Sequence, residues 1–443
     1  MDIQISDHFN YKKLIQFTLP TIAMMIFTSI YGVVDGIFVS NFVGSDAFAA
    51  VNLIMPVLMI LGSIGFMIGT GGSALVSKTL GEGKAQKAKE IFTMLVFVVI
   101  LLGTILALVG IVLIRPIARL LGADEVLLEY CVVYGRILLL GNVPFMLQNT
   151  FQSFLVVAER PQMGLKISVA AGVTNMILDF VFVYLLRWGI VGAGVATVTS
   201  QLVGSVIPLL YFVKKNPSPL HLVRFEWDKG ALIKSCTNGS SEMMTNLSMS
   251  LVNMLYNFQL MRLAGADGVS AYGIIMYVSF IFVSVYIGYS IGATPIISFH
   301  YGAGNHAELK NLFKKSLTII VVASIALTGV AEITSDMLAG VFVSYDANLL
   351  EMTAIAVRLY SLSYLFSGIN ILASGIFTAF NDGLVSAVIS FLRTLLFQVV
   401  MVLLLPMLFG LNGIWLAIVV AEIMALAVSV FCFVKYRKKY HYA

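Results

Sequence analysis

Long apolar runs separated by short polar stretches dominate the chain. Each run is about 20 residues or more, the length that a helix needs to cross a bilayer. Lipid requires every backbone amide to be satisfied internally, so runs of this length predict helices rather than strands. The pattern predicts twelve of them. Their expected bounds are 14–40, 47–77, 91–114, 127–157, 164–186, 190–213, 231–262, 269–299, 311–343, 350–380, 384–409 and 412–434.

Composition supports a membrane protein. Of the 443 residues, 59% are hydrophobic and 11% are charged, against about a quarter charged in a soluble domain. The mean hydropathy is +0.97. The polar start "MDIQISDHFNYKK" lacks the small-residue cleavage site of a signal peptide, so we expect the first apolar run to be a permanent span. The three cysteines are scattered and predict neither disulfides nor a metal site.

The basic residues predict the orientation. With both termini inside, 21 of the 27 lysines and arginines fall in inner segments, including every lysine. This distribution is a positive-inside signal, and it predicts a multi-pass membrane protein with both termini in the cytoplasm.

The two halves of the chain resemble each other at one fixed offset. "VGSDAFAAVN" at 43–52 parallels "AGADGVSAYG" at 264–273, and "WGIVGAGVA" at 188–196 parallels "FGLNGIWLA" at 409–417, each 221 residues later. We therefore expect two pseudo-symmetric bundles of six helices: an N-lobe of residues 1–213 and a C-lobe of residues 231–443 with a basic tail. The polar stretch 214–230 is expected to be a cytoplasmic linker. Two parallel lobes suit alternating access in a transporter.

Acidic residues inside the apolar runs are few, and each is costly, at about 3 kcal/mol or more at the bilayer centre. Asp35 and Asp179 are expected at a similar depth in the outer half of the membrane, as is Thr197. Asn175 lies one turn from Asp179, and Ala193 one turn from Thr197. These oxygens predict a site for a proton or Na⁺, and two carboxylates so close can share one proton. The plainer reading is that each aspartate only bonds a neighbouring helix.

The repeat does not duplicate this site. The residue 221 positions after Asp35 is Tyr256, and Asp179 is matched by Val400 or Met401. Ion coupling is therefore expected in the N-lobe alone. Glu242 lies in the inner third of the seventh predicted helix, where either a substrate-binding acid or a solvated acid is expected.

Flexible and aromatic side chains within the spans suit a permissive site for lipophilic, often cationic molecules, although core packing explains any single one of them. Besides Glu242, the candidates for the substrate cavity are Tyr31, Met55, Met176, Met249, Tyr256 and Met276. No nucleotide-binding loop and no catalytic pairing of side chains is present in the sequence. We therefore expect a transporter and not an enzyme, with an ion gradient as its energy source.

The stretch "LPTIAMMIFTSIYGVVDGIFVSNFVGSDAFAAVNL" at 19–53 resembles the first-helix signature of MATE transporters, the multidrug and toxic compound extrusion family. "AERPQMGLKISVAAGVTNMILDFVFVY" at 158–184 and "GIVGAGVATVTSQ" at 189–201 continue the resemblance, which covers essentially the whole chain and is greatest for the bacterial MepA-like and DinF-like branch.

The resemblance implies an all-α membrane fold of twelve transmembrane helices in two bundles (the MATE/MOP type), and drug/cation antiport. It implies an N-lobe site at Asp35, Asn175, Asp179, Ala193 and Thr197. In a sodium-coupled protein, Asp35, Asn175, Asp179 and Thr197 would ligate Na⁺. It further implies a hinge at Pro20, a monomer, and a location in the bacterial cytoplasmic (inner) membrane.

Another branch of that family uses C-lobe acids in helices seven and ten. Here Glu242 occupies the first position, but the tenth predicted helix has no acid, so a C-lobe cation site of that kind is not expected. The expected partners are small organic cations and membrane lipids, with no nucleic acid and no cofactor beyond Na⁺ or H⁺. The alternative reading is a lipid-linked oligosaccharide flippase of the same superfold. Such a protein would line its cleft with several basic residues, and Arg393 is the one strong candidate inside a span.

Overall fold

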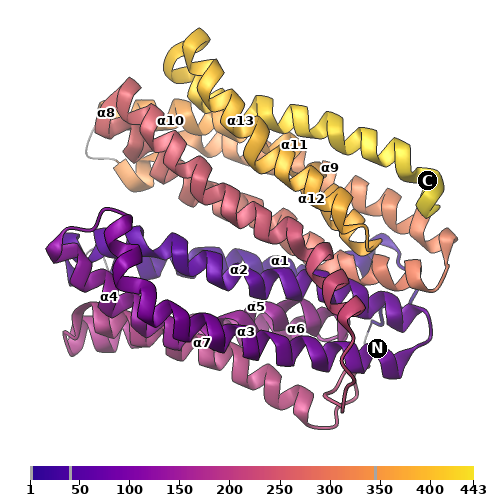
Figure 1. The fold of residues 1–443 in the computed structure, drawn as a ribbon. Helices are drawn as coiled ribbons and strands as arrows, with labels where there is room; N and C mark the ends of the chain where they lie inside the picture. Colours follow the sequence, from indigo (N-terminus) through magenta and orange to yellow (C-terminus); the bar gives the residue numbers. More distant parts are fainter. Residues whose placement is uncertain (1–2, 39–41, 344–346) are drawn as a thin grey trace.

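The computed structural model describes residues 3–38, 42–343 and 347–443, and these are helical with short connections. The helices run in the order shown in Figure 1. Their bounds are α1 Tyr11–Phe38, α2 Ser45–Gly81, α3 Ala85–Leu120, α4 Glu125–Leu140, α5 Asn142–Val157, α6 Pro161–Asp179, η2 Phe180–Leu185, α7 Gly189–Val213, α8 Lys229–Gly302, α9 His306–Val343, α10 Ala347–Ser361, α11 Tyr364–Ala379, α12 Gly383–Phe391, η3 Leu392–Leu396 and α13 Phe397–Tyr440. The two η elements are π-helical.

The predicted twelve spans are found once bends and breaks are taken into account. Eight helical segments of the described chain are long and apolar enough to cross a bilayer, and the bent pairs α4/α5 (54°) and α10/α11 (45°) bring the total to ten. Two of the long segments are each two spans. The 74-residue α8 breaks at Gly265 (φ 63°), and α13 breaks at Gly410 (φ 57°). Both breaks use the left-handed region that favours glycine, and both fall between helices that the sequence predicts to be separate.

The helices form two bundles of six spans. Helices α1–α7 (indigo to magenta in Figure 1) make one bundle, and α8–α13 (rose to yellow) make the other. The two halves turn at matching glycines. Gly189 (φ 59°) corresponds to Gly410, and Gly83 (φ 77°) corresponds to Gly304 (φ 66°). A repeat that is weak in sequence is therefore preserved in the backbone at the points where the chain reverses.

The bundles meet through α2 and the second half of α8, near the end of the molecule that holds both termini. Ser77 Oγ donates to the carbonyl oxygen of Pro295 at 2.6 Å. Ser298 Oγ donates to the carbonyl oxygen of Ala74 at 2.5 Å. In the repeat, Ser298 corresponds to Ser77 and Pro295 corresponds to Ala74. The two bonds are therefore the same contact, made twice about a pseudo-two-fold axis.

Glycines allow the two helices to come this close. A Cβ atom on Gly81 would lie 2.0 Å from the carbonyl oxygen of Phe299, and one on Gly302 would lie 2.1 Å from that of Lys78. These contacts are again related by the repeat. Side chains at either position would push the bundles apart, so the backbones touch here directly.

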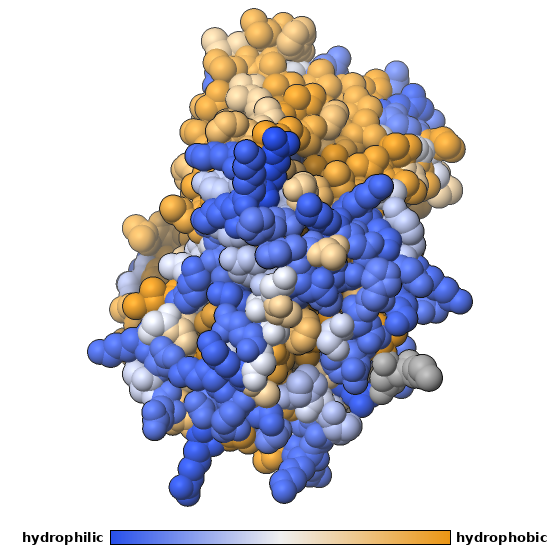
Figure 2. All heavy atoms as spheres, turned by 90° about the vertical axis from the view of Figure 1, so that its right-hand side faces the viewer, coloured by the Kyte–Doolittle hydropathy of each residue, from blue (hydrophilic) through white to orange (hydrophobic). Residues whose placement is uncertain are grey.

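The end of the molecule that holds the termini is polar and basic. Figure 2 views this end and shows hydrophilic side chains covering it, with apolar surface exposed beyond it. We call it the basic end. The stretch between α7 and α8 lies here. It ends at Asp228, which caps the N-terminus of α8 by accepting a hydrogen bond from the backbone N–H of Ala231 at 2.9 Å. The Lys87 ammonium lies 2.8 Å from Asp228, and this bond holds the pKa of the Asp228 carboxyl below its usual range.

Candidate functional site

Helix α6 places a carboxamide and a carboxylate on one buried face. Asn175 and Asp179 are four residues apart, so their side chains lie one above the other. They are 2% and 0% exposed, respectively. The π-helix η2 begins directly after Asp179. A π turn widens the helix and is frequent at functional sites; here it changes the geometry of the span at the point where the carboxylate is buried.

Asp35 comes to these two side chains from α1. Its carboxyl group lies within hydrogen-bonding reach of the Asp179 carboxyl and the Asn175 carboxamide. The structure thus brings together three of the predicted residues.

The buried oxygens of this cluster lack donors. Within the described residues, no donor reaches Oδ1 of Asp35, Oδ1 of Asn175, or either carboxylate oxygen of Asp179. Ionised carboxylates can only accept hydrogen bonds, so the two aspartates do not satisfy each other without a shared proton. Buried acceptors without a partner are rare in proteins and call for an explanation such as an ion.

Two further helices supply hydroxyl groups. Thr197 Oγ1, on α7, donates to the carbonyl oxygen of Ala193 at 3.0 Å, and Ala193 itself is fully buried. Thr197 also interacts with the hydroxyl of Tyr134 on α4, and Tyr134 in turn interacts electrostatically with Asp35 and Asp179. Thr197 is therefore linked to the aspartates through Tyr134.

Tyr134 is the residue of this cluster that the sequence did not indicate. It is 1% exposed, and no spacing along α4 marks it, because α4 carries no acid at that depth. Only the packing of α4 against α2 and α7 brings its hydroxyl to the cluster.

The residues predicted to line a substrate cavity lie in different surroundings. Tyr31 lies near the acid cluster, where it interacts with Asp35. Tyr256 is 1% exposed and stacks on Tyr272 with ring centroids 4.7 Å apart, as a core residue does. The others, all partly buried, are Met55, Met176, Glu242, Met249 and Met276.

The C-lobe contains a different charged cluster. Arg393, on η3, donates through Nε to both carboxylate oxygens of Glu422, at 2.9 and 3.0 Å. Asn370 Nδ2 donates to the same carboxylate at 2.7 Å, and Ser429 Oγ donates to Asn370 Oδ1 at 2.8 Å. Glu422, 1% exposed, is therefore neutralised and hydrogen-bonded within the protein, unlike the acids of the N-lobe.

Donor chemistry limits what the N-lobe cluster could hold. Its atoms are carboxylate, carboxamide and hydroxyl oxygens, which suit a proton or a hard cation such as Na⁺. In the part of the chain that the structure describes, no group of three His, Cys, Asp or Glu side chains is placed to bind a metal ion.

Two bundles of six spans with a buried acid cluster in one of them define a multi-pass membrane transport protein of the MATE/MOP fold. The chain belongs to the MatE family, the multidrug and toxic compound extrusion transporters, whose family model matches residues 20–181 and 243–404. These two matches are of equal length, one in each bundle, in agreement with the internal repeat.

Similar proteins come from several staphylococci. The multidrug export protein MepA of Staphylococcus saprophyticus is 25% identical over 425 residues, covering 94% of this chain and 92% of that protein. MepA of Staphylococcus haemolyticus is 23% identical, covering 95% and 92%.

Solved structures share the fold. A MATE crystal structure in complex with MaL6 aligns with a TM-score of 0.92 at 22% identity, covering 97% of this chain and 98% of that one. An outward-facing multidrug resistance MATE transporter of the MOP superfamily aligns with a TM-score of 0.91 at 22% identity, with the same coverage.

Proposed function

We propose that this protein is a secondary active multidrug efflux transporter. It exports lipophilic or cationic organic compounds in exchange for Na⁺ or H⁺ by alternating access, without ATP. The family membership and the similarity to proteins named for multidrug export support the class of cargo. The observation that carries the coupling mechanism is the group of buried oxygens around Asp35 and Asp179 that lack donors.

Those oxygens explain why an ion would be needed. A buried polar group without a partner costs about 1–3 kcal/mol, and more when it is charged. A proton shared by the two carboxylates, or a Na⁺ bound between them, would remove that cost. Because Asp35 is on α1 and Asp179 on α6, an ion that holds them together also holds two helices of the N-lobe in one arrangement.

The orientation follows from charge. The positive-inside rule assigns the basic end to the cytoplasm, with the protein in the bacterial inner membrane. The two bundles touch at that end through the matching serine and glycine contacts, so this arrangement is closed toward the cytoplasm.

A cavity at the opposite end supports a route from outside. It has a volume of about 650 Å³, and its lining includes Val183, Tyr184 and Leu185 of η2 together with Arg187. Val183 is one turn from Asp179, so the cavity abuts the helix that holds the ion-binding acid. We infer that an external ion reaches Asp179 from this side.

The C-lobe contacts favour organic cations over anionic lipid-linked sugars. Arg393, the intramembrane arginine that would serve a flippase, is paired with Glu422. With Arg393 paired, we propose cationic cargo, with Glu242, Tyr31 and the predicted methionines as candidate contacts. We expect the protein to act as a monomer in direct contact with membrane lipids.

Transport assays with matched variants test the coupling site. Asp35→Asn and Asp179→Asn each remove one carboxylate while keeping the side-chain size, and Asp46→Asn makes the same change at an exposed position as a control. We expect both site variants to lose ethidium efflux from cells at normal expression, and the control to retain it. Undiminished efflux by both site variants would contradict the assignment. Proteoliposomes with separate Na⁺ and pH gradients would identify the ion.

A further inference from the structure

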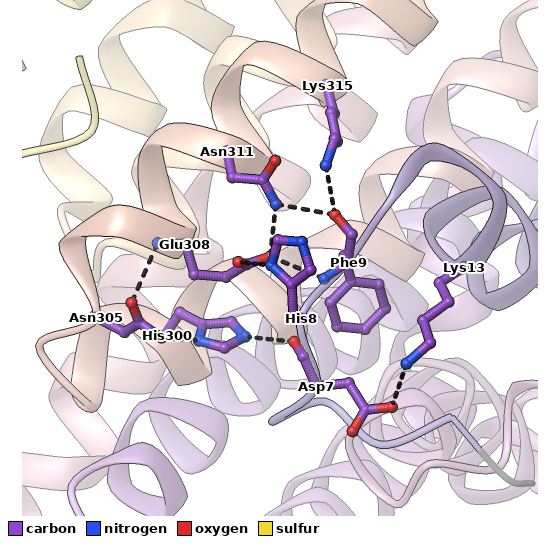
Figure 3. Close-up of polar contacts among 9 residues, drawn as sticks. All are labelled: Asp7, His8, Phe9, Lys13, His300, Asn305, Glu308, Asn311 and Lys315. Atoms are coloured by element: carbon purple, nitrogen blue, oxygen red, sulfur yellow. Dashed lines mark hydrogen bonds and ion pairs between the residues drawn. The ribbon is translucent and has the colours of Figure 1, made fainter.

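The segment before α1 is held by the C-lobe through its backbone. We call residues 3–10 the N-terminal strap. The Glu308 carboxylate accepts from the backbone N–H of Phe9 at 2.9 Å. Asn311 Nδ2 and Lys315 Nζ both donate to the carbonyl oxygen of Phe9, at 2.8 and 2.7 Å. Figure 3 shows these α9 side chains converging on Phe9. Contacts to backbone atoms fix the path of the strap irrespective of its side chains.

A second set of contacts involves the two histidines. His8 Nδ1 lies 2.6 Å from the other oxygen of Glu308, and His300 Nε2 lies 3.2 Å from the carbonyl oxygen of Asp7 (Figure 3). Glu308 is 6% exposed, so its carboxylate is largely shielded from water. Besides the strap, its one other side-chain partner among the described residues is Asn311 of the same helix, whose Nδ2 donates to Oε1 at 2.8 Å.

The strap also contacts the N-lobe. The backbone N–H of Ile5 donates to Glu159 Oε1 at 2.9 Å, and Glu159 follows the end of α5. Two apolar side chains of the strap are buried. Ile5 and Phe9 are 2% and 0% exposed, and they belong to the hydrophobic cluster formed mainly by the C-lobe. The strap therefore spans the basic end from one bundle to the other.

We propose that the N-terminal strap is a clamp on the cytoplasmic gate and that Glu308 is its gating residue. The inference rests on the proposed alternating access and adds a functional locus outside the ion site. When the cytoplasmic ends of the bundles separate, α1 moves with the N-lobe while Glu308 moves with the C-lobe. The bonds of Glu308 to His8 and Phe9 are then broken, so they set how readily the gate opens.

Distances between the cytoplasmic ends test the clamp directly. Spin labels are placed on Lys84→Cys (N-lobe) and Lys310→Cys (C-lobe), both exposed, after replacement of the three native cysteines by alanine. Glu308→Ala removes the two bonds to His8 and Phe9 and leaves those of Asn311, Lys315 and His300 in place. Lys13→Ala is the matched control, because its 3.2 Å ion pair with Asp7 does not join the two bundles. We expect Glu308→Ala to raise the population with separated labels by about tenfold, the effect of about 1.4 kcal/mol, and Lys13→Ala to leave it unchanged.

A cross-link asks whether release is required for transport. His8→Cys/Glu308→Cys protein is joined by a short bis-methanethiosulfonate reagent and then reduced. We expect the cross-link to arrest ethidium efflux and reduction to restore it. An unchanged label distance in Glu308→Ala, or full efflux with the cross-link in place, overturns the clamp. If Glu308→Ala fails to fold, Glu308→Gln, which keeps the side-chain size and removes the charge, takes its place in the distance measurement. The label distances are measured without an ion gradient. The clamp proposal can therefore be refuted while the proposed antiport stands, and the antiport can be refuted while the clamp proposal stands.

Discussion

Removing one partner of the Arg393–Glu422 pair is expected to destabilise the protein far more than removing both. Glu422 is 1% exposed, and the Arg393 side chain is 14% exposed. Breaking a buried pair by deleting one charge costs about 3–5 kcal/mol, because the other charge stays buried without compensation. The same principle predicts that a neutral pair of similar size costs little, since the desolvation of both ions is removed as well.

The structure supplies the variants for this test. Within the described part of the chain, Arg393→Met leaves Glu422 with Asn370 as its remaining side-chain donor. We expect a loss of ~3 kcal/mol or more, seen as a clear fall in the thermal unfolding midpoint of the purified protein in detergent. Glu422→Gln should cost a similar amount by leaving Arg393 unpaired.

The double variant Arg393→Met/Glu422→Gln is expected to recover most of that loss. Arg437→Met, at the basic surface and exposed, controls for loss of an arginine as such. Equal destabilisation in the single and double variants would refute the reasoning, since it would mean that packing and not charge compensation makes the site stable.

Three further outcomes are expected. Tyr134→Phe should weaken the coupling ion's apparent affinity by a few-fold without unfolding the protein, measured as the Na⁺ or H⁺ concentration for half-maximal efflux; an unchanged value would separate Tyr134 from the site. Gly302→Leu should prevent closure of the basic end, because its Cβ would lie 2.1 Å from the Lys78 carbonyl oxygen, and labels on the two bundles should then show the open distance alone. The lowered pKa of Asp228 beside Lys87 means that their bond stabilises the protein at neutral pH. That contribution is present above the usual aspartate pKa, about 4, and is lost as the pH falls through the lower pKa that Asp228 has in the folded protein. The difference in thermal unfolding midpoint between wild type and Asp228→Asn should therefore disappear in acid.

The fold was largely predictable because lipid imposes a simple rule on the sequence. Span length, basic loops and the 221-residue offset together indicate two bundles of six helices, and the breaks at Gly265 and Gly410 fall where the apolar runs are interrupted. The proximity of Asp35 and Asp179 followed from their similar expected depth. Depth, however, does not specify which helices are neighbours, so the part played by Tyr134 was not foreseen.

Contacts between distant segments are not recoverable from such patterns. The polar start of the chain carries no helical periodicity, and nothing in its composition indicates that Phe9 would be held by Glu308, some 300 residues away. Arg393 likewise looked like an isolated basic residue, because its partner Glu422 lies on another helix at no characteristic spacing. These interactions depend on packing between helices, which hydropathy does not encode.

Each lobe buries an acid in the membrane, and the two lobes differ in how the cost of burying that charge is offset. In the C-lobe, Glu422 is matched by a cation that the chain itself carries on η3, and the carboxylate is fully hydrogen-bonded. In the N-lobe, Asp179 lies just before the π-helix η2, and neither of its oxygens has a donor among the described residues. In the proposed coupling, a mobile ion neutralises Asp179 as Arg393 neutralises Glu422. Arg393 neutralises Glu422 permanently, so binding and release of ions give the C-lobe no cause to rearrange. The N-lobe aspartates would be neutralised only while an ion is bound, so that bundle can respond to the ion. The repeat then accounts for the shared fold, and the difference between the lobes at these acids accounts for the proposed coupling.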